Sequence, residues 1–399
     1  MKSRERTGIL LIILYLGFIS LGLPDAVLGS AWPAMRHSFG RPLESAGALQ
    51  TMTTVLSVAS SLAAGWLLFR WHTGVIIAAS SVMTGCAMYG YAFAHGWPVL
   101  LFFTIFFGLG QGAVDAAVNG YMAKHYSARH MNWVHGCWGI GAACGPFIMT
   151  SVFSAGYGWR TGYFSIAAAQ TILSLVFFST LGLWGGADKP DAPLLPRTPD
   201  GTPGERRLPM RRAYITGGAN TLFYFCYAGV EPLVGLWGGS YLADELGAHP
   251  ATAAVGVTVF WSLLAAGRFG MGIFADRVRA ETILRAGIFA ALAGGCVFVF
   301  APGVTVFCFA MAVTGLGISP LYPVMMHDTP ARVGRALSDR VVGFQVGAAL
   351  SGSAVVPLAF GYAAKAWGLR IFGYAVVVFA FFVLCMHEVS FRHSLRRGK

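Results

Sequence analysis

Charged residues are scarce in this chain of 399 residues. Only 11% are Asp, Glu, Lys or Arg and 56% are hydrophobic, whereas an ordinary soluble protein contains about 25% charged residues. The mean hydropathy is +0.63. Apolar runs of roughly 20 residues recur, each long enough to cross a bilayer as a helix, and none shows the period-two alternation of a membrane β-strand. The composition therefore predicts an all-α polytopic membrane protein.

Motifs of catalysis and of metal binding are also missing. There is no G-x-S-x-G, H-E-x-x-H or Walker sequence, so we expect neither an enzyme nor an ATP-driven machine. The cysteines lie within apolar runs without a CxxC or Cys/His cluster, which indicates small buried side chains and no metal or cofactor. They are Cys86, Cys137, Cys144, Cys226, Cys296, Cys308 and Cys385.

Basic residues outnumber acidic ones and give a formal charge of +12. Most of them fall in predicted loops on the side of the membrane shared by both termini, which explains the charge without a nucleic-acid partner. By the positive-inside rule both termini are cytoplasmic in an inner or plasma membrane, and the number of spans is even. We interpret the first apolar run, after Lys2 to Arg6, as a membrane helix because no clear cleavage site follows.

Twelve spans are predicted, with a linker in the middle of the chain. Residues 186–212 contain six of the 18 prolines and separate two six-helix bundles, 1–185 and 213–399. The bundles echo each other, as Gly108-Leu109-Gly110 and Gly315-Leu316-Gly317 illustrate, and such repeats are typical of secondary transporters. The spans lie near 8–31, 44–69, 74–95, 98–121, 131–155, 161–184, 213–242, 252–274, 280–300, 303–326, 338–364 and 369–389.

These features resemble the major facilitator superfamily. The clearest motif runs from Gly267 to Arg277, where Gly267, Arg268, Asp276 and Arg277 form a gate motif of the loop after the eighth span. The matching first-half loop, Gly65 to Gly74, lacks the Asp. Within the superfamily the chain is similar to the fucose–proton symporter-like group of sugar permeases, in the segments Gly22–Asp25, Gly108–Tyr121, His135–Gly139, Tyr227–Glu231, Gly315–Pro323 and Gly352–Pro357.

One stretch in the fourth span combines polar side chains with an apolar context. Gln111, Asp115 and Asn119 are spaced four residues apart and share one helical face. A carboxylate near the bilayer centre costs about 2.5–3.5 kcal/mol on insertion scales, so it indicates a functional site. The alternative is a structural acid paired with a neighbouring polar group.

Only three acids lie well inside apolar sequence, namely Asp25, Asp115 and Glu231. In the family that the chain resembles, an acid in span one and another in span four act in proton coupling and sugar recognition, which carries over to Asp25 and Asp115. The family often has Glu in span four, so Asp115 is a shorter variant. For Asp25 an alternative remains, because Pro24 can kink the helix and leave the carboxylate to serve a freed backbone group.

The seventh span offers a second polar face. Asn220, Tyr224, Tyr227 and Glu231 follow helical spacing, and we expect Pro232 and Gly235 to break the helix where it lines a cavity. Tyrosines and an acid facing water suit the hydroxyls of a sugar. A packed aromatic face is the alternative.

Other candidates for substrate binding are weaker. His135 and Trp138 begin span five, where the histidine can bind substrate, shuttle protons or play a structural role. The tryptophans among the rest can equally belong to an interfacial belt. These further candidates are Trp32, Trp261, Tyr322 and Gln345.

The sequence thus favours proton-coupled symport of a neutral monosaccharide or polyol by alternating access, with protons and the bilayer as partners and no sign of oligomerisation. We assign Arg268 to the loop motif, and the lack of any other cation deep in a span argues against organic anions. The alternatives are a proton-coupled exporter of drugs or metabolites, an importer of a bulkier conjugate such as a siderophore or a peptide-linked sugar, and a receptor without flux.

Overall fold

The computed structural model describes residues 3–126, 128–184, 209–274 and 277–394. The described residues form helices joined by short turns, and no strand occurs among them. The α-helices are α1 Ser3–Asp25, α2 Val27–Phe39, α3 Ser45–Arg70, α4 Thr73–Phe93, α5 Trp97–His125, α6 Ala128–Ser154, α7 Trp159–Ser179, α8 Met210–Ser240, α9 Pro250–Phe274, α10 Ala280–Phe300, α11 Val304–Ile318, α12 Leu321–Val333, α13 Arg335–Trp367 and α14 Phe372–His393. Short 3₁₀ turns η1 Leu181–Leu183 and η3 Leu369–Ile371 and a π-helical turn η2 Tyr241–Glu245 complete the set.

The prediction of an all-α polytopic membrane protein is confirmed. Within the described residues, 11 helical segments are long and apolar enough to cross a membrane. Helix α8 is not among them, since its glycines, aromatic residues and polar residues lower its hydropathy, yet it occupies the place of the predicted seventh span. Helices suit this setting because they satisfy their own backbone hydrogen bonds in lipid.

Two prolines inside predicted spans have different effects. The first span divides into α1 and α2 at Ala26, directly after Asp25, and Pro24 lies in the last turn of α1. The expected break at Pro232 is wrong, because α8 continues through Pro232 to Ser240 and only then changes to π-helical turns. A membrane helix tolerates proline where neighbouring groups satisfy the freed carbonyl.

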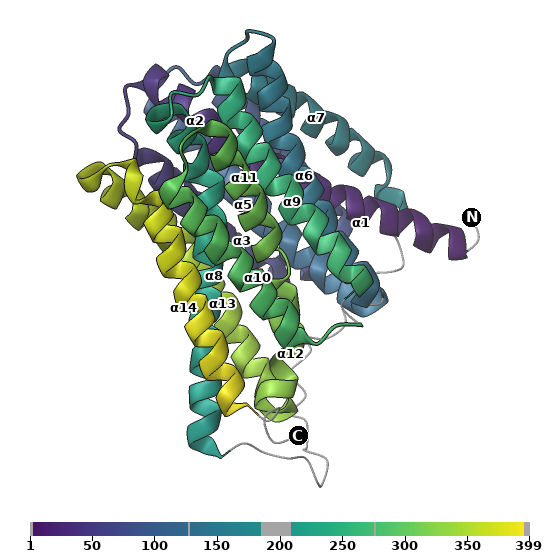
Figure 1. Ribbon diagram of the computed structural model, residues 1–399. Helices are drawn as coiled ribbons and strands as arrows, with labels where there is room; N and C mark the ends of the chain where they lie inside the picture. Colours follow the sequence, from purple (N-terminus) through teal and green to yellow (C-terminus); the bar gives the residue numbers. More distant parts are fainter. Residues whose placement is uncertain (1–2, 127, 185–208, 275–276, 395–399) are drawn as a thin grey trace.

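The helices pack as two groups that meet mainly through an extensive contact of α6 with α9 (Figure 1). Helices α1 to α7 pack mainly on one another, and so do α8 to α14. Between the groups, α6 lies against α9, α3 against α13, and α2 against α8. We call these groups the first and second halves. The predicted domain boundary at 186–212 stays a prediction, since residues 185–208 lie outside the described part.

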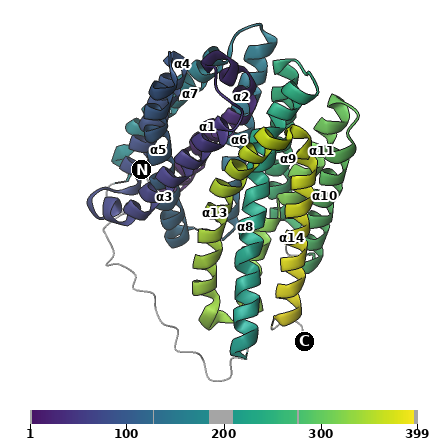
Figure 2. The same ribbon diagram turned by 90° about the vertical axis from the view of Figure 1, so that its left-hand side faces the viewer.

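The halves are close at one end of the bundle and diverge toward the other (Figures 1 and 2). We call the close end, where α2 and η2 lie, the α2 end, and the opposite end, where α8 begins and α14 finishes, the terminal end. At the α2 end the backbones of Gly29 and Gly235 are so close that a Cβ on Gly29 would lie 1.9 Å from the Gly235 oxygen. Glycine therefore permits the closest approach of α2 and α8.

Two ion pairs also join the halves at the α2 end. Arg36 Nη2 lies 2.9 Å from Asp244 Oδ1, and Lys365 Nζ lies 2.5 Å from Glu44 Oε1. Burial favours a raised pKa for Glu44, but hydrogen bonds from Lys365 and from the backbone of Glu44 outweigh it and hold the pKa below its usual value. The carboxylate is therefore charged at neutral pH, and on acidification the pair is lost when Glu44 takes up a proton.

One face of α13 contacts the first half near the α2 end and is exposed toward the terminal end. Near its C-terminal end, Ala354 accepts a hydrogen bond from Thr51 of α3 at 2.9 Å, and Leu358 lies against Gly47. Further toward the terminal end, Gly343 and Gly347 are exposed, and a Cβ on either would have no atom within 4 Å. Helices α3 and α13 therefore touch at the α2 end only.

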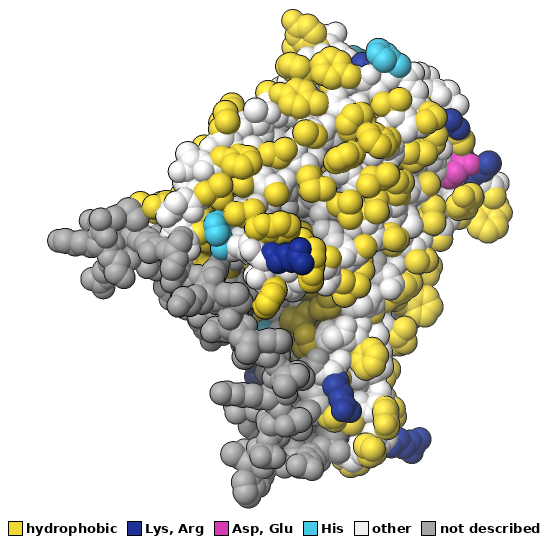
Figure 3. All heavy atoms as spheres, turned by 180° about the vertical axis from the view of Figure 1, so that it is seen from behind, with side chains coloured by type: hydrophobic (Ala, Val, Ile, Leu, Met, Phe, Trp, Pro, Cys, Tyr) yellow, Lys and Arg dark blue, Asp and Glu magenta, His cyan; other side chains and the backbone are white. Residues whose placement is uncertain are grey.

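Apolar side chains cover much of the outer surface (Figure 3). Leu62 and Phe300 are each 81% exposed, as expected for side chains that face lipid. So many exposed apolar side chains would be a liability in water and are consistent with a polytopic membrane protein.

The close approach at Gly29 yields a stability prediction. Gly→Ala inside a helix normally stabilises by up to about 1 kcal/mol, but at Gly29 the added methyl group meets the Gly235 carbonyl. We expect Gly29→Ala to lower the thermal unfolding midpoint of the detergent-solubilised protein. Gly218→Ala on α8, where an added Cβ has no atom within 4 Å, serves as the control and should raise the unfolding midpoint. An equal rise in both variants would contradict the contact.

Candidate functional site

The carboxylate of Asp25 lies at the end of α1, where the backbone turns into α2. Gln111 of α5 donates from Nε2 to Asp25 Oδ1 at 3.1 Å. The contact joins residues 86 positions apart. Asp25 also lies within electrostatic reach of both Asp115 and Glu231, so the three acids found in the sequence share one region between the halves.

Asp115 lies one turn further along α5 than Gln111. Asn119 Nδ2 donates to Asp115 Oδ1 at 3.1 Å, while the Oδ1 atom of Asn119 is buried and accepts no hydrogen bond from the described residues. No Lys or Arg of the described chain forms an ion pair with Asp25 or Asp115. Both carboxylates are therefore held by neutral donors, Asp115 by the Asn119 amide and Asp25 by the Gln111 amide and the Trp138 indole.

Glu231 faces this site from α8 in the second half. Its Oε2 accepts from Tyr227 OH at 2.6 Å and from Arg268 Nη2 at 3.0 Å. The Glu231 and Arg268 side chains are only 13% and 14% exposed. The assignment of Arg268 to the loop motif is therefore wrong, because its side chain turns into the centre of the protein, where a low-dielectric environment favours pairing with Glu231.

Aromatic rings connect the two sides. The Arg268 guanidinium lies 5.1 Å from the ring centre of Trp138 on α6, and Trp138 makes an edge contact with Trp261 of α9 at 5.6 Å. Indole Nε1 of Trp261 is buried and donates to no described residue. Tyr322 of α12 lies 6.1 Å from Tyr227, centre to centre. The site thus has carboxylates and amides on one wall and an ion pair with aromatic rings on the other.

Not all predicted residues contribute in the expected way, although Tyr227 belongs to the site through its hydrogen bond to Glu231 and His135 lies within electrostatic reach of Arg268. The expectation that Tyr224 and Tyr227 face water is wrong, since their side chains are 0% and 2% exposed. The hydroxyl group of Tyr224 donates to the backbone oxygen of Tyr322 at 2.7 Å. Trp32 is fully buried and donates to the Leu43 backbone at 3.1 Å. His135 is exposed, with its ring edge against Phe18 at 5.4 Å.

Asn220 and Gln345 belong to a separate buried network in the second half. Asn220 accepts from Ser390 at 2.5 Å, and Gln345 donates to Thr329 at 2.9 Å. The centre of this network is Arg332, which pairs with Asp328 at 2.7 Å; both are essentially unexposed.

The sequence interpretation missed this pair because it ended the tenth span at residue 326, whereas α12 extends to Val333. The i,i+4 spacing of Asp328 and Arg332 was the available signal.

The gate motif is only partly described. A Cβ on Gly267 would lie 2.0 Å from Ser319 Oγ, so Gly267 permits close packing of α9 on the turn after α11. Arg277 is exposed, and Asp276 lies outside the described residues. The structure therefore connects Arg268 to the central site, and the place of Asp276 in the gate motif stays a prediction.

The family model of the Major Facilitator Superfamily matches residues 14–237, more than half of the chain. The chain belongs to this superfamily. The superfamily assignment establishes the protein as a membrane transporter. No curated protein sequence matches the chain, and membership of the fucose–proton symporter-like group stays a prediction.

Two solved structures have a similar fold over nearly the whole length of this chain. One is a bacterial homologue of the human lysosomal transporter Spinster in an inward-facing, unoccupied conformation, with a TM-score of 0.77 and 14% identity over 99% of each chain. Another is a bacterial Spinster homologue in an inward-facing, occupied conformation, with a TM-score of 0.72 and 13% identity over 98% of this chain and 97% of that one. At such identities the likeness concerns the fold alone.

The Glu231–Arg268 pair yields a second prediction. We expect Arg268→Met to destabilise the protein by about 3 kcal/mol, because it leaves a buried carboxylate without its cation. Glu231→Gln in the same chain should restore most of that loss. Chemical unfolding in detergent, followed by tryptophan fluorescence, measures both. Equal stability of the single and double variants would contradict a shared buried pair.

Proposed function

We propose that the protein is a proton-coupled symporter of a small neutral polyhydroxy solute, a monosaccharide or a related polyol, that works by alternating access. Asp25 and Asp115 exchange the proton and accept hydrogen bonds from the substrate. Glu231, Arg268 and the adjacent aromatic rings form the opposite wall. The cytoplasm lies at the terminal end, in agreement with the positive-inside rule.

The observation that carries the proposal is the pair of carboxylates without a cationic partner. Gln111 and Asn119 each donate an amide N–H to one of them, and the Trp138 side chain also donates to Asp25. The remaining carboxylate lone pairs are free to accept from hydroxyl groups. When such a carboxylate takes up a proton it loses its charge, which lowers the cost of enclosing it in a closed, dry state. Proton uptake and closure are thereby linked.

The position of Arg268 inside the protein does not change the expectation that the substrate is neutral. Because Glu231 neutralises it at 3.0 Å, the two side chains together bring no net charge to the site. An organic anion entering the site would meet Asp25 and Asp115 without a free cation to offset them. A neutral solute carries no such penalty, and its C–H faces suit the indole rings of Trp138 and Trp261.

The arrangement of the halves supports alternating access. Ion pairs and the Gly29 contact close the α2 end, while Gly343 and Gly347 on α13 have no neighbours toward the terminal end. A rocking movement that brings α3 onto these glycines closes the terminal end, because small residues permit close helix approach.

A second candidate function is proton-coupled export of a cationic, aromatic compound. It is favoured by the same two carboxylates together with Trp138 and Trp261, whose ring faces attract cations. Substrate charge separates the two candidates, since a cation replaces the proton at the carboxylates whereas a neutral solute accompanies it.

The decisive test is uptake by liposomes that contain the purified protein and an internal pH dye. Neutral sugars, polyols, amphipathic cations and organic acids are added singly. We expect one neutral solute to drive internal acidification, and we expect Asp115→Asn to abolish proton-driven accumulation while sparing exchange of substrate for substrate. Proton release on addition of a cation, with no response to sugars, supports the exporter instead. Full proton-driven accumulation by Asp115→Asn would overturn the coupling role.

The glycines of α13 provide a test of the movement. Gly347→Trp adds a bulky ring where nothing lies within 4 Å, so the protein should fold with an unchanged unfolding midpoint. Closure of the terminal end should fail, and net uptake should fall at least about tenfold, as expected when a gating movement is blocked. Gly218→Trp, in open space on α8, is the matched control. Normal uptake by Gly347→Trp excludes closure over this face.

A further inference from the structure

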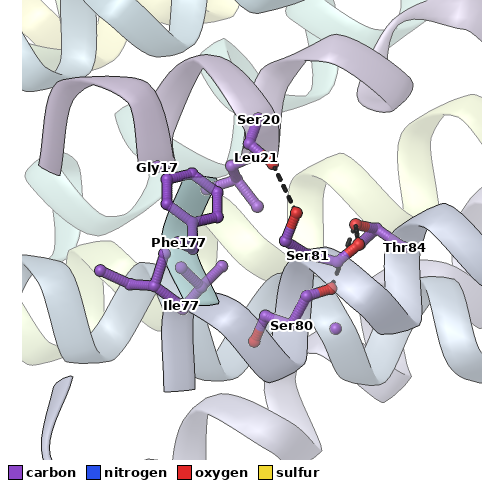
Figure 4. Close-up of a pocket in the computed structure, with 10 residues that line it drawn as sticks. Gly17, Ser20, Leu21, Ile77, Ser80, Ser81, Thr84 and Phe177 are labelled. Atoms are coloured by element: carbon purple, nitrogen blue, oxygen red, sulfur yellow. Dashed lines mark hydrogen bonds between the residues drawn. The ribbon is translucent and has the colours of Figure 1, made fainter. Parts of the chain in front are cut away.

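A buried polar cluster lies in the first half, between α1, α4 and α7. Ser20, Ser81, Thr84, Gln170 and Ser174 are each no more than 6% exposed. Figure 4 shows Ser20 of α1 facing Ser81 of α4, beside a small cavity that Ile77 and Phe177 also line. The central site does not include these residues, and the sequence interpretation did not single them out.

The cluster is centred on Gln170, which is 0% exposed. Its Nε2 donates to the backbone oxygen of Ser20 at 2.7 Å, and its Oε1 accepts from Ser20 Oγ at 2.6 Å. One amide on α7 thus holds both the backbone and the side chain of a single residue on α1.

The backbone oxygen of Ser20 is the acceptor that proline leaves without its usual donor. In a regular helix it accepts from the N–H of residue 24, but Pro24 has no N–H. At membrane depth a free carbonyl costs free energy because water does not replace the missing donor. Gln170 supplies the donor from another helix.

This contact also bears on Asp25. An open alternative from the sequence is that the Asp25 side chain serves a backbone group freed by Pro24. Instead, Gln170 binds the Ser20 oxygen, and the Asp25 carboxylate accepts from Gln111 at 3.1 Å. The carboxylate is therefore available for the central site.

The last turns of α1 are held from a second direction by α6. A Cβ on Gly22 would lie 2.1 Å from the Trp138 oxygen, and a Cβ on Gly141 would lie 2.2 Å from the Ile19 oxygen. On the face toward α4 and α7, beside the small cavity, Gln170 makes the two shortest hydrogen bonds of Ser20, and the Ser20 hydroxyl also lies 3.4 Å from Ser81 Oγ. The direction of the final turn, and with it the place of the Asp25 carboxylate, depends on these hydrogen bonds.

We propose that Gln170 is a positioning residue for the proton-accepting carboxylate of Asp25, acting as a substitute for the N–H that Pro24 lacks. The consequence of this proposal for transport rests on the proposed function. The structural part of the proposal, the energetic coupling of Gln170 to Pro24, is independent of any substrate.

The structural part is tested by a double-mutant cycle on unfolding free energy. Gln170→Leu removes both hydrogen-bonding groups at similar size. Pro24→Ala restores an N–H to the Ser20 oxygen, so Gln170→Leu should cost clearly less in the Pro24→Ala chain than in the wild-type chain. Should Gln170→Leu alone not fold, the double variant should still fold. Equal costs in both chains, or failure of both Gln170→Leu chains to fold, overturn the proposal.

The transport part is tested by the pH dependence of uptake in liposomes. We expect Gln170→Leu to lower proton-driven uptake about tenfold and to move the pH of half-maximal uptake by about one unit, because a misplaced carboxyl binds its proton differently. Gln170→Glu, whose protonated carboxyl can donate to and accept from Ser20, should restore the wild-type profile. Ser174→Ala is the control, since Ser174 donates to Ser81 at 2.9 Å and makes no hydrogen bond to α1 within the described chain.

An unchanged pH profile in folded Gln170→Leu protein overturns the positioning role, even when less protein folds. Loss of coupling in Ser174→Ala to the same extent does so as well. If Asp115→Asn keeps full proton-driven accumulation, the proposed function fails, but the double-mutant cycle still decides whether Gln170 replaces the proline N–H.

Discussion

The structure depends on one constraint, that a polar group at membrane depth costs free energy unless it finds a partner within the protein. Helices meet it for most of the backbone. Where Pro24 interrupts the pattern, Gln170 of another helix supplies the donor. The same constraint places Arg268 against Glu231 and Arg332 against Asp328. The contacts of Gln170 and Arg268 join separate helices, whereas Arg332 and Asp328 pair within α12, so a few polar groups add specific contacts to an apolar bundle.

Much of the fold was predictable because span formation is a local property. An apolar run of sufficient length becomes helical whatever its neighbours are. Ten of the twelve predicted spans each correspond to one observed α-helix, while the first and tenth are each divided between two α-helices. The effect of proline was less predictable. Pro24 precedes a break, whereas Pro232 lies inside a continuous helix. The difference depends on neighbouring helices, which a local pattern does not reveal.

The candidate site was predictable in its acids and not in their partners. Asp25, Asp115 and Glu231 stand out because a carboxylate in an apolar run is unusual. The Gln111 contact to Asp25 spans 86 residues, so only the fold reveals it. The assignment of Arg268 to the loop followed from the gate motif, although its position within a span already indicates a buried side chain. Gln170 had a detectable signal, as a lone amide in an apolar span, but its target is a backbone oxygen and no side-chain pattern indicates it.

The distribution of charge between the halves has a further consequence. The acids Asp25 and Asp115 belong to the first half, while Glu231 and Arg268 are bound to each other within the second. A relative rotation of the halves leaves that ion pair intact, yet it changes the distance from a fixed dipole to two carboxylates in a medium of low dielectric constant. The proton affinity of the carboxylates therefore depends on the angle between the halves, and the preferred angle depends in turn on whether the carboxylates hold protons. No ion pair has to break for this coupling.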